Sequence, residues 1–200
     1  MRVIAGTARS MPLRTVKGLD TRPTTDKTKE TLFNILQPDI PGCRFLDLFS
    51  GSGSIAIEAL SRGAEHAVLV EQDSRACACI LENLRFTKLI ERGELQKCSV
   101  LTALQRMEGQ KPFDIIFMDP PYNQDLERQV LTYLTKSTLA DEETVIVVEA
   151  SLRTDFTYLE ELGYRAYKYK KYKTSQHVFI VKDSDEEGEE NDSSDLSGQL

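Results

Sequence analysis

The sequence has few of the residues that build metal centres, and it lacks long apolar runs. It contains two histidines and four cysteines (Cys43, Cys77, Cys79 and Cys98), with no Cys-x-x-Cys pair. We therefore expect reduced, partly buried thiols and no metal site. No apolar run reaches the roughly 18 residues that span a membrane, and the N-terminus lacks the apolar core of a signal peptide. These absences predict a cytoplasmic protein without a membrane partner.

The net charge of −7 is concentrated at the end of the chain. Residues 183–200 hold eight acids and no Lys or Arg, and without them 25 basic residues face 24 acidic ones. This segment has almost no apolar content to offset its ordering entropy, so we predict a disordered acidic tail. Residues 1–182 remain, enough for one domain with a real core.

Positive charge gathers in two segments. Residues 1–36 contain seven basic residues against three acids, and residues 162–182 contain six against none. If the fold brings these segments together, they form one phosphate-binding face. Two separate solvated faces would have no such meaning, and basicity alone does not decide between the two.

Strand-like and helical segments alternate along the chain. Strands are predicted at 44–49, 67–71, 95–98, 113–118, 144–149, 164–172 and 177–181, and helices at 26–36, 55–62, 73–86, 100–107, 126–134 and near 158–162. This alternation predicts an α/β fold with a mostly parallel sheet covered by helices on both faces. The last two strands are too close for a helical crossover, so they should be antiparallel. Before the first helix, residues 1–20 are expected to form a short strand and a loop.

A glycine-rich turn follows the first strand of the sheet. It carries Asp47, Phe49, Ser50, Gly51 and Gly53, and it precedes a helix whose first N–H groups are free to bind a ligand. Such a turn can hold the pyrophosphate of a dinucleotide, and the glycines alone do not exclude a nicotinamide cofactor. The acid Asp47 favours instead the sulfonium and amino groups of S-adenosylmethionine. The five residues are therefore the candidate cofactor loop.

Two more candidates end the neighbouring strands. Glu71 lies 20 residues after Gly51, where an acid can accept the hydroxyl groups of an adenosine ribose. Taken alone, it could equally be a surface acid at a strand end. Ser99 follows the third strand, where the adenine ring of the cofactor would lie.

The run Asp119-Pro120-Pro121-Tyr122 follows a buried apolar strand. The two prolines fix the backbone and hold the Asp119 carboxylate at the carboxyl edge of the sheet, where open α/β sheets bind ligands. An exocyclic base amine is a poor nucleophile, and acceptors on its N–H groups would expose its lone pair. Asp119 and the Pro120 carbonyl can be those acceptors, and Tyr122 can stack on the base. Positioning and electrostatics would then drive methyl transfer.

These motifs resemble the RsmD family of ribosomal RNA methyltransferases. The opening Met1–Gly6, the block Arg22–Leu36, the glycine loop and the Asp119 motif follow in the order of that family. The sequence departs from it at Ser10-Met11, at Ser99, at Tyr172-Lys173 and in the acidic tail.

The resemblance implies a class I, Rossmann-like methyltransferase sheet of seven strands with the last strand antiparallel. The substrate it implies is the N2 amine of guanine 966 in 16S ribosomal RNA, and Arg22 and Thr24 would close over the methionine end of the cofactor. Residues 1–40 would complete the cofactor and RNA site. The partner would be ribosomal RNA, free or in the small subunit, and we expect a monomer.

Three alternatives stay open at this stage. A DNA adenine-N6 methyltransferase uses similar Pro-Pro-aromatic chemistry, although little chain remains here for a DNA-recognition region. A non-catalytic RNA-binding protein could keep the fold. A nicotinamide oxidoreductase would need hydride-transfer residues, and none is obvious.

Overall fold

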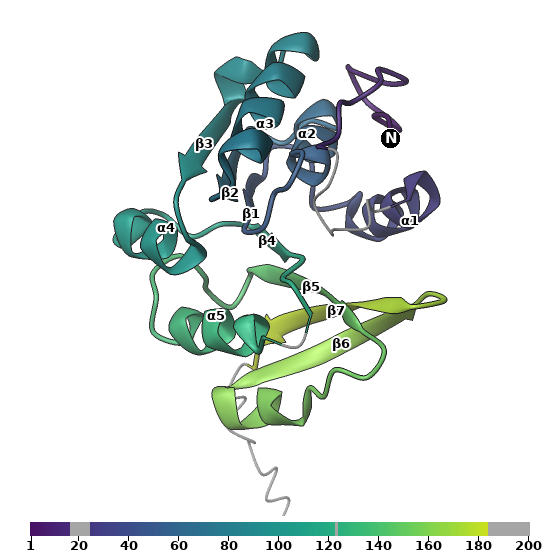
Figure 1. Ribbon diagram of the computed structural model, residues 1–200. Helices are drawn as coiled ribbons and strands as arrows, with labels where there is room; N and C mark the ends of the chain where they lie inside the picture. Colours follow the sequence, from purple (N-terminus) through teal and green to yellow (C-terminus); the bar gives the residue numbers. More distant parts are fainter. Residues whose placement is uncertain (17–24, 123, 184–200) are drawn as a thin grey trace, which may run out of the picture.

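One twisted sheet with helices on both faces forms the body of the protein (Figure 1). The computed structural model describes residues 1–16, 25–122 and 124–183. Within these residues, seven strands lie in the order β3-β2-β1-β4-β5-β7-β6. Their bounds are β1 Arg44–Asp47, β2 His66–Glu71, β3 Gly93–Lys97, β4 Ile115–Met118, β5 Val145–Ser151, β6 Tyr164–Lys171 and β7 Ser175–Lys182. Strands β1 to β5 pair in parallel, and β7 is antiparallel to both of its neighbours. The predicted α/β fold with an antiparallel last strand is confirmed.

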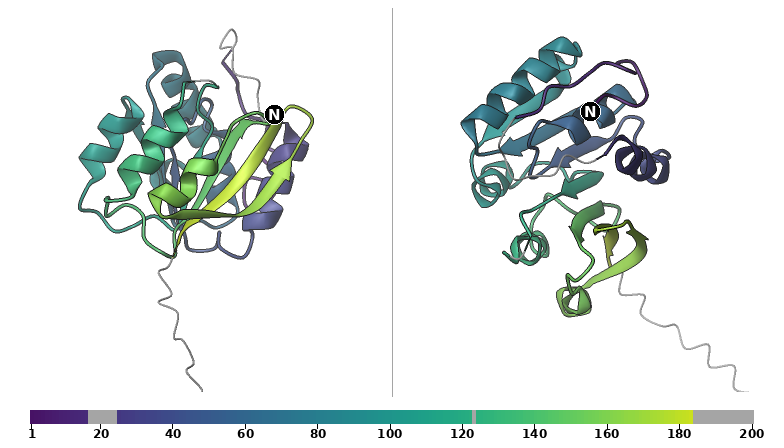
Figure 2. Two further views of the ribbon diagram at one scale, coloured as in Figure 1. Left: turned by 90° about the horizontal axis from the view of Figure 1, so that it is seen from below. Right: turned by 45° about the vertical axis from the view of Figure 1, so that its right-hand side comes forward.

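The helices divide between the two faces and close two apolar cores. They are α1 Asp26–Leu36, α2 Ser54–Ser61, α3 Ser74–Phe86, α4 Val100–Met107 and α5 Leu126–Leu134, with short 3-10 helices η1 Ile90–Arg92 and η2 Thr157–Leu162. One core joins α1, α2 and α3 to the sheet, and the other joins α4, α5 and η2 to its opposite face. The two views of Figure 2 show the helices on either side of the strands.

Helices begin where local capping chemistry predicts them. The Asp73 carboxylate accepts the N–H groups of Arg75 and Ala76 at the start of α3. The Ser99 hydroxyl accepts the N–H of Thr102 at the start of α4. Such side chains satisfy N–H groups that have no partner within the helix. The predicted bounds of α1, α4 and α5 agree with the structure.

The N-terminal segment differs from its prediction. Within residues 1–16 there is no strand, only an isolated bridge between Arg2 and Pro12. This segment runs along α2 instead of joining the sheet. Gly6 lies so close to α2 that an added Cβ would be 1.8 Å from the Ser61 carbonyl oxygen. Backbone and side-chain contacts with α2 and α3, and not pairing with the sheet, therefore hold the beginning of the chain.

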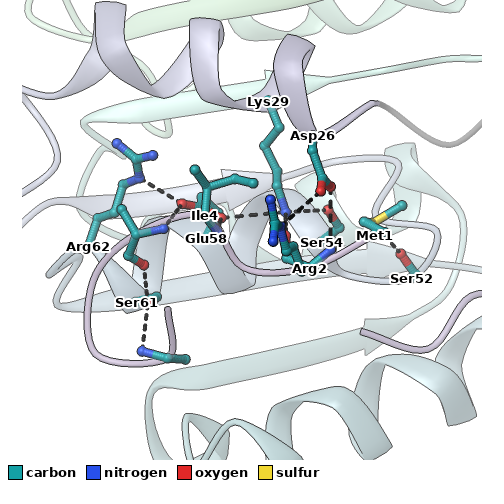
Figure 3. Close-up of polar contacts among 12 residues, drawn as sticks. Met1, Arg2, Ile4, Asp26, Lys29, Ser52, Ser54, Glu58, Ser61 and Arg62 are labelled. Atoms are coloured by element: carbon teal, nitrogen blue, oxygen red, sulfur yellow. Dashed lines mark hydrogen bonds and ion pairs between the residues drawn. The ribbon is translucent and has the colours of Figure 1, made fainter. Parts of the chain in front are cut away.

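A buried ion pair fixes this segment between α1 and α2 (Figure 3). Lys29 of α1 and Glu58 of α2 are fully buried, with Nζ 3.4 Å from Oε2. Glu58 also accepts the backbone N–H groups of Ile4 at 2.7 Å and Ala5 at 3.0 Å. On its other side, Arg62 Nε donates to Glu58 Oε1 at 2.8 Å. The carboxylate thus satisfies donors from three parts of the chain.

The structure corrects one detail of the charge analysis. Lys29 was counted with the basic surface of residues 1–36, but it has no exposed area. Its Nζ donates to the Arg2 carbonyl at 2.7 Å and to the Ser54 hydroxyl at 3.3 Å. Burial lowers the pKa of Lys29, although the charge of Glu58 opposes this shift. Lys29 therefore contributes to the interior and not to a phosphate-binding face.

No helix in the described part of the chain is long and apolar enough to cross a membrane. Among the same residues, no group of three His, Cys, Asp or Glu side chains is arranged to hold a metal ion. The four cysteines are free thiols: Cys43, Cys77 and Cys79 are buried and Cys98 is half-buried.

Candidate active site

A cavity of about 450 Å³ opens at the carboxyl ends of β1, β2 and β4. Parallel α/β sheets bind ligands at this edge, where neighbouring strands send their connections to opposite faces. Its wall includes most of the residues selected from the sequence: Asp47, Phe49, Ser50, Gly51, Glu71, Ser99, Asp119 and Pro121. Residues far apart in the sequence therefore share one site because the strand order brings them together.

The glycine loop is shaped by its own backbone bonds. Ser50 donates its N–H to the Val70 carbonyl, and its hydroxyl donates to the Asp47 carbonyl at 2.8 Å. Gly51 and Gly53 have φ values of 53° and 78°, in the left-handed region that favours glycine. An added Cβ would meet nothing within 4 Å at Gly51 but would be 3.0 Å from Leu69 Cδ2 at Gly53. Gly51 thus leaves room at the cavity, while Gly53 permits close packing beneath it.

Glu71 holds the loop as well as facing the cavity. One carboxylate oxygen accepts the Gly51 N–H at 2.9 Å, and the other accepts the N–H groups of Gln72 and Asp73, both at 2.8 Å. A carboxylate has about four acceptor positions. Three are used by the backbone, so Glu71 keeps capacity for about one ligand hydroxyl, fewer than the two expected from the sequence.

Asp47 is a buried acid whose carboxylate makes no hydrogen bond of ordinary geometry within the described residues, although the backbone N–H groups of Ala56 and Phe49 lie near it. It is 1% exposed, and within the described residues neither carboxylate oxygen meets hydrogen-bonding distance and angle. Burial raises the pKa of Asp47 to about 7; the nearby Ala56 N–H opposes this rise and the charge of Glu71 adds to it. An unpartnered buried carboxylate is costly. A cationic ligand in the cavity would relieve that cost.

Ser99 lies in the cavity wall, but its hydroxyl is already used. It caps α4 and lies 2.9 Å from the Thr102 hydroxyl. The wall next to it consists of Cys98, Val100 and Leu101. An adenine ring would therefore meet a largely apolar surface here.

The Asp119 motif forms the opposite wall. Asp119 and Pro121 line the cavity, while Pro120 is buried and Tyr122 is 45% exposed. Asp119 is half-buried in the cavity wall, and desolvation raises the pKa of its carboxyl group well above the ordinary value. The negative charges of Glu149 and Asp47 add to the rise. Sequence reasoning did not select Glu149, because only the pairing of β4 with β5 brings it near Asp119.

Arg22 and Thr24 lie outside the described residues. The described residues just before this gap show where the chain enters it. Thr15 and Val16 lie in the cavity wall, and so does Met1, which is held near Ser52. The N-terminal segment therefore forms part of the site.

The donor set fits S-adenosylmethionine. The unpartnered carboxylate of Asp47 suits a positively charged sulfonium or ammonium group, and Glu71 keeps acceptor capacity for a ribose hydroxyl. A pyrophosphate would instead meet Asp47, Glu71 and Asp119 in one cavity, three acids that repel its charge. The cavity chemistry therefore favours a cationic nucleoside over a dinucleotide.

The hairpin of β6 and β7 carries a group of exposed positive charges toward this edge of the sheet. Lys168, Lys170, Lys171 and Lys173 are exposed, together with Tyr167 and Tyr169 at 45% and 49%. Strand β6 runs parallel to β4, so its last residues lie at the same edge as Asp119. Two basic residues of the N-terminal segment are instead paired, Arg2 with Asp26 and Arg14 with Glu82.

Comparisons with known proteins agree with this geometry. The family model described as Conserved hypothetical protein 95 matches residues 1–181. The ribosomal RNA small subunit methyltransferase D of Haemophilus influenzae is 37% identical over 150 residues, which cover 74% of this chain and 78% of that protein. Its namesake in Escherichia coli K12 is 34% identical over 154 residues, 76% of this chain and 75% of the relative. The solved structure of yhhF from Escherichia coli has a TM-score of 0.81 and 29% identity, and the match covers 92% of this chain and 98% of that one.

Proposed function

Because the chain belongs to the RsmD family, whose model carries the description Conserved hypothetical protein 95, we propose that it methylates the exocyclic N2 amine of a guanine in 16S ribosomal RNA. The chain is a methyltransferase with a class I fold. The methyl donor in this proposal is S-adenosylmethionine, and the target is guanine 966 of that RNA. Residues 1–182 form the working unit.

One observation supports this proposal above the others: two acids with different tasks face one cavity. Asp47 is buried and unpartnered on β1, while Asp119 begins the Pro-Pro motif after β4. Asp47 and Phe117 are paired across the two strands, so the two acids lie two residues apart along adjacent strands. One acid can face a cationic donor while the other faces the group that receives the methyl.

Each residue of the proposed site has a physical task. When bound, S-adenosylmethionine supplies a methyl group on a positively charged sulfur. Asp47 would balance that charge, and Glu71 would accept a ribose hydroxyl. The apolar wall beside Ser99 would hold the adenine ring, and Arg22 and Thr24 would face the methionine carboxylate.

Asp119 and the Pro120 carbonyl would accept the two N–H groups of the target amine. These hydrogen bonds weaken the conjugation of the nitrogen lone pair with the purine ring and orient it toward the methyl group. Tyr122 is exposed enough to stack on the base. A base can occupy this position only after it leaves its own stack.

The β6–β7 hairpin supports RNA as the substrate. Neighbouring strands are separated by about 4.8 Å, so Lys170 and Lys171, three strands from β4, lie roughly 14 Å from the Asp119 edge. That span suits phosphates two or three nucleotides from the target base. We propose that the hairpin binds the RNA backbone next to the flipped guanine, in free RNA or in the small subunit.

The decisive experiment maps the modified nucleotide. Purified protein is incubated with labelled S-adenosylmethionine and small subunits from cells that lack this activity, and the labelled base is identified. We expect label on guanine N2 with the wild-type protein and none with Asp119→Ala, which should still bind the cofactor. Label only on adenine N6 would contradict the proposed specificity, and methylation of duplex DNA would favour the DNA enzyme instead.

A further inference from the structure

A row of ionisable side chains continues from Asp119 across the sheet. Met118, the last residue of β4, pairs with Val148 on β5. Asp119 directly follows β4 and Glu149 is the next residue of β5, so the two acids occupy neighbouring positions at this edge of the sheet. Glu149 in turn pairs with His177 on β7. Paired residues on adjacent strands point to the same face. The rings of His177 and Phe117 make a T-shaped contact, with centroids 6.1 Å apart. His177 therefore lies on the face of the sheet to which Phe117 of β4 points.

Hydrogen bonds link the outer members of this row. His177 Nε2 lies 3.1 Å from Glu149 Oε2, and the Tyr172 hydroxyl lies 3.0 Å from His177 Nδ1. The Ser175 hydroxyl donates to Glu149 Oε1 at 3.4 Å. His177 is fully buried and Glu149 is 7% exposed. His177 and Glu149 are therefore shielded from solvent, while Tyr172 is half-buried.

One tautomer satisfies every group in this chain. The Nε2–H tautomer of His177 can donate to Glu149 from Nε2 and accept from Tyr172 at Nδ1. Burial raises the pKa of Tyr172 to about 12, and the charge of Glu149 adds to the rise, so its hydroxyl keeps the proton that it donates. Glu149 then receives hydrogen bonds but no cation, and its negative charge is left to act on Asp119.

We propose that Glu149, held in place by His177 and Tyr172, is a positioning residue that makes Asp119 a stronger base for the proton leaving the target amine. This inference rests on the proposed methylation of an exocyclic amine. The amine lone pair forms the bond to the methyl carbon, and the electrons of the sulfur–carbon bond stay on sulfur. The nitrogen becomes positively charged, its N–H bond breaks, and the proton moves to an Asp119 oxygen. Asp119 later releases this proton to water.

The charges around Asp119 favour this role. Burial is the largest cause of its raised pKa, followed by Glu149 on β5 and Asp47 on β1. Asp47 is itself influenced by Glu71 on β2. On the far side of the row, Lys170 of β6 pairs with His177, but its side chain is exposed. Among the described residues of this row, His177 is the buried side chain beside Glu149 that could carry a positive charge, and in its Nε2–H tautomer it carries none.

The first test is the pH profile of Glu149→Gln. Glutamine keeps the size and an acceptor oxygen but removes the charge, so the pKa of Asp119 should fall. The acid limb of the kcat/KM profile should then move to lower pH by about one unit, since two like charges on neighbouring strands repel each other by more than ~1 kcal/mol at these distances. The plateau kcat should drop about three- to tenfold because the base is weaker.

The chain offers a matched control in its other Glu–His pair. His66 Nε2 lies 3.6 Å from Glu94 Oε2 on β2 and β3, with both side chains partly exposed. Glu94→Gln should leave the pH profile unchanged. If the acid limb of Glu149→Gln stays in place, or moves only as much as in Glu94→Gln, the proposal is wrong.

Substitutions of His177 separate positioning from packing. His177→Gln can still donate to Glu149, whereas His177→Leu cannot. We expect His177→Gln to keep most of the activity and the profile, and His177→Leu to change both. Thermal melting of each variant identifies those that fail to fold. Equal losses in two well-folded variants would mean that the donor to Glu149 is irrelevant.

Two further measurements do not need activity. Nitrogen NMR of the two histidines, assigned with His66→Gln, should show His177 as the neutral Nε2–H tautomer at neutral pH. An imidazolium would neutralise Glu149 and overturn the proposal.

The pH dependence of unfolding is the second measurement, because a raised Asp119 pKa lowers stability as pH rises above the ordinary Asp range. Asp119→Asn should remove less of this fall in a Glu149→Gln background than in the wild type.

These experiments test the proposed function and the role of Glu149 separately. If the wild-type protein methylates no RNA, the proposed function fails, while the NMR and unfolding measurements still test the coupling of Glu149 to Asp119. If methylation is normal but the Glu149 variant behaves like the Glu94 control, only the inference about Glu149 fails.

Discussion

The buried pair of Lys29 and Glu58 gives a quantitative test of how the N-terminal segment is held. The perturbation is Glu58→Ala. It removes the partner of a fully buried ammonium and the acceptor of two backbone N–H groups in the N-terminal segment. Lys29 keeps only the Arg2 carbonyl and the Ser54 hydroxyl as partners.

The expected loss is about 4 kcal/mol at neutral pH. Removing one partner of a buried ion pair typically costs about 3–5 kcal/mol, because the other charge stays buried. The freed N–H groups of Ile4 and Ala5 are half-buried and can reach water, so they add little. For a domain of this size about 1 kcal/mol lowers the Tm by roughly 2–4 °C, so the Tm should fall by about 8–16 °C.

The loss should shrink as the pH rises. The pKa of Lys29 is already lowered by burial, and Glu58 is the main influence that opposes this shift. Without Glu58, the folded-state pKa moves further below the unfolded value of about 10.5. Between those two values the unfolded chain binds more protons than the folded one, so stability increases with pH. The variant should therefore approach the wild type in alkaline buffer.

The assay is urea unfolding at several pH values, with Glu82→Ala as the control. Glu82 pairs with Arg14 at 2.6 Å, so it also joins the N-terminal segment to a helix, but both side chains are exposed. Exposed pairs contribute about 0–1 kcal/mol, so this variant should change little. If Glu58→Ala costs less than about 1 kcal/mol, or its cost does not vary with pH, the buried pair does not hold the segment as argued.

Three further predictions address the site and the tail. Glu71→Ala should weaken S-adenosylmethionine binding by about tenfold or more, since the Gly51 N–H loses its acceptor together with the ribose; calorimetry showing unchanged affinity would refute this role. Replacing Lys170, Lys171 and Lys173 with Gln should raise the KM for RNA and preserve kcat. The slope of log KM against log salt concentration should fall by the contribution of up to about three phosphate contacts. The tail was predicted to begin at Asp183, but the Asp183 N–H donates to the Gly163 carbonyl, so the deletion starts one residue later. Deleting residues 184–200 should leave the Tm unchanged, whereas a large drop would show that the tail contributes to the fold.

Local chemistry made much of the fold predictable from the sequence. Helices were predicted to begin at residues 73 and 100. In the structure the side chains of Asp73 and Ser99 cap the helices α3 and α4 that begin directly after them. The predicted first strand was too long at its end. It was expected to reach residue 49, but the ladder ends at Asp47 because the Ser50 N–H turns to Val70 on the other neighbour. Such an ending depends on the adjacent strands and not on the segment itself.

The parts of the site that were missed depend on tertiary pairing. Lys29 occupies a helix whose Leu32, Phe33 and Leu36 are buried, yet nothing local marks the lysine as buried. Its burial requires Glu58, which lies on a different helix. In the same way, Glu149 and His177 become neighbours only when β7 pairs with β5. Motifs that carry their own geometry were found, whereas side chains that depend on distant partners were not.

The position of β7 between β5 and β6 also has a consequence for how the protein is made. Strand β7 is the last strand that the described residues form, yet it occupies an interior place in the sheet. Pairings between distant segments form slowly, and an N-terminal part synthesised first can begin to fold before the last strand is available. We expect a nascent chain to assemble the cofactor cavity from β1, β2 and β4 before His177 reaches Glu149. Insertion of β7 would then complete the sheet and bring His177 to Glu149. We therefore expect a chain truncated before β7 to bind the methyl donor but to transfer the methyl group poorly.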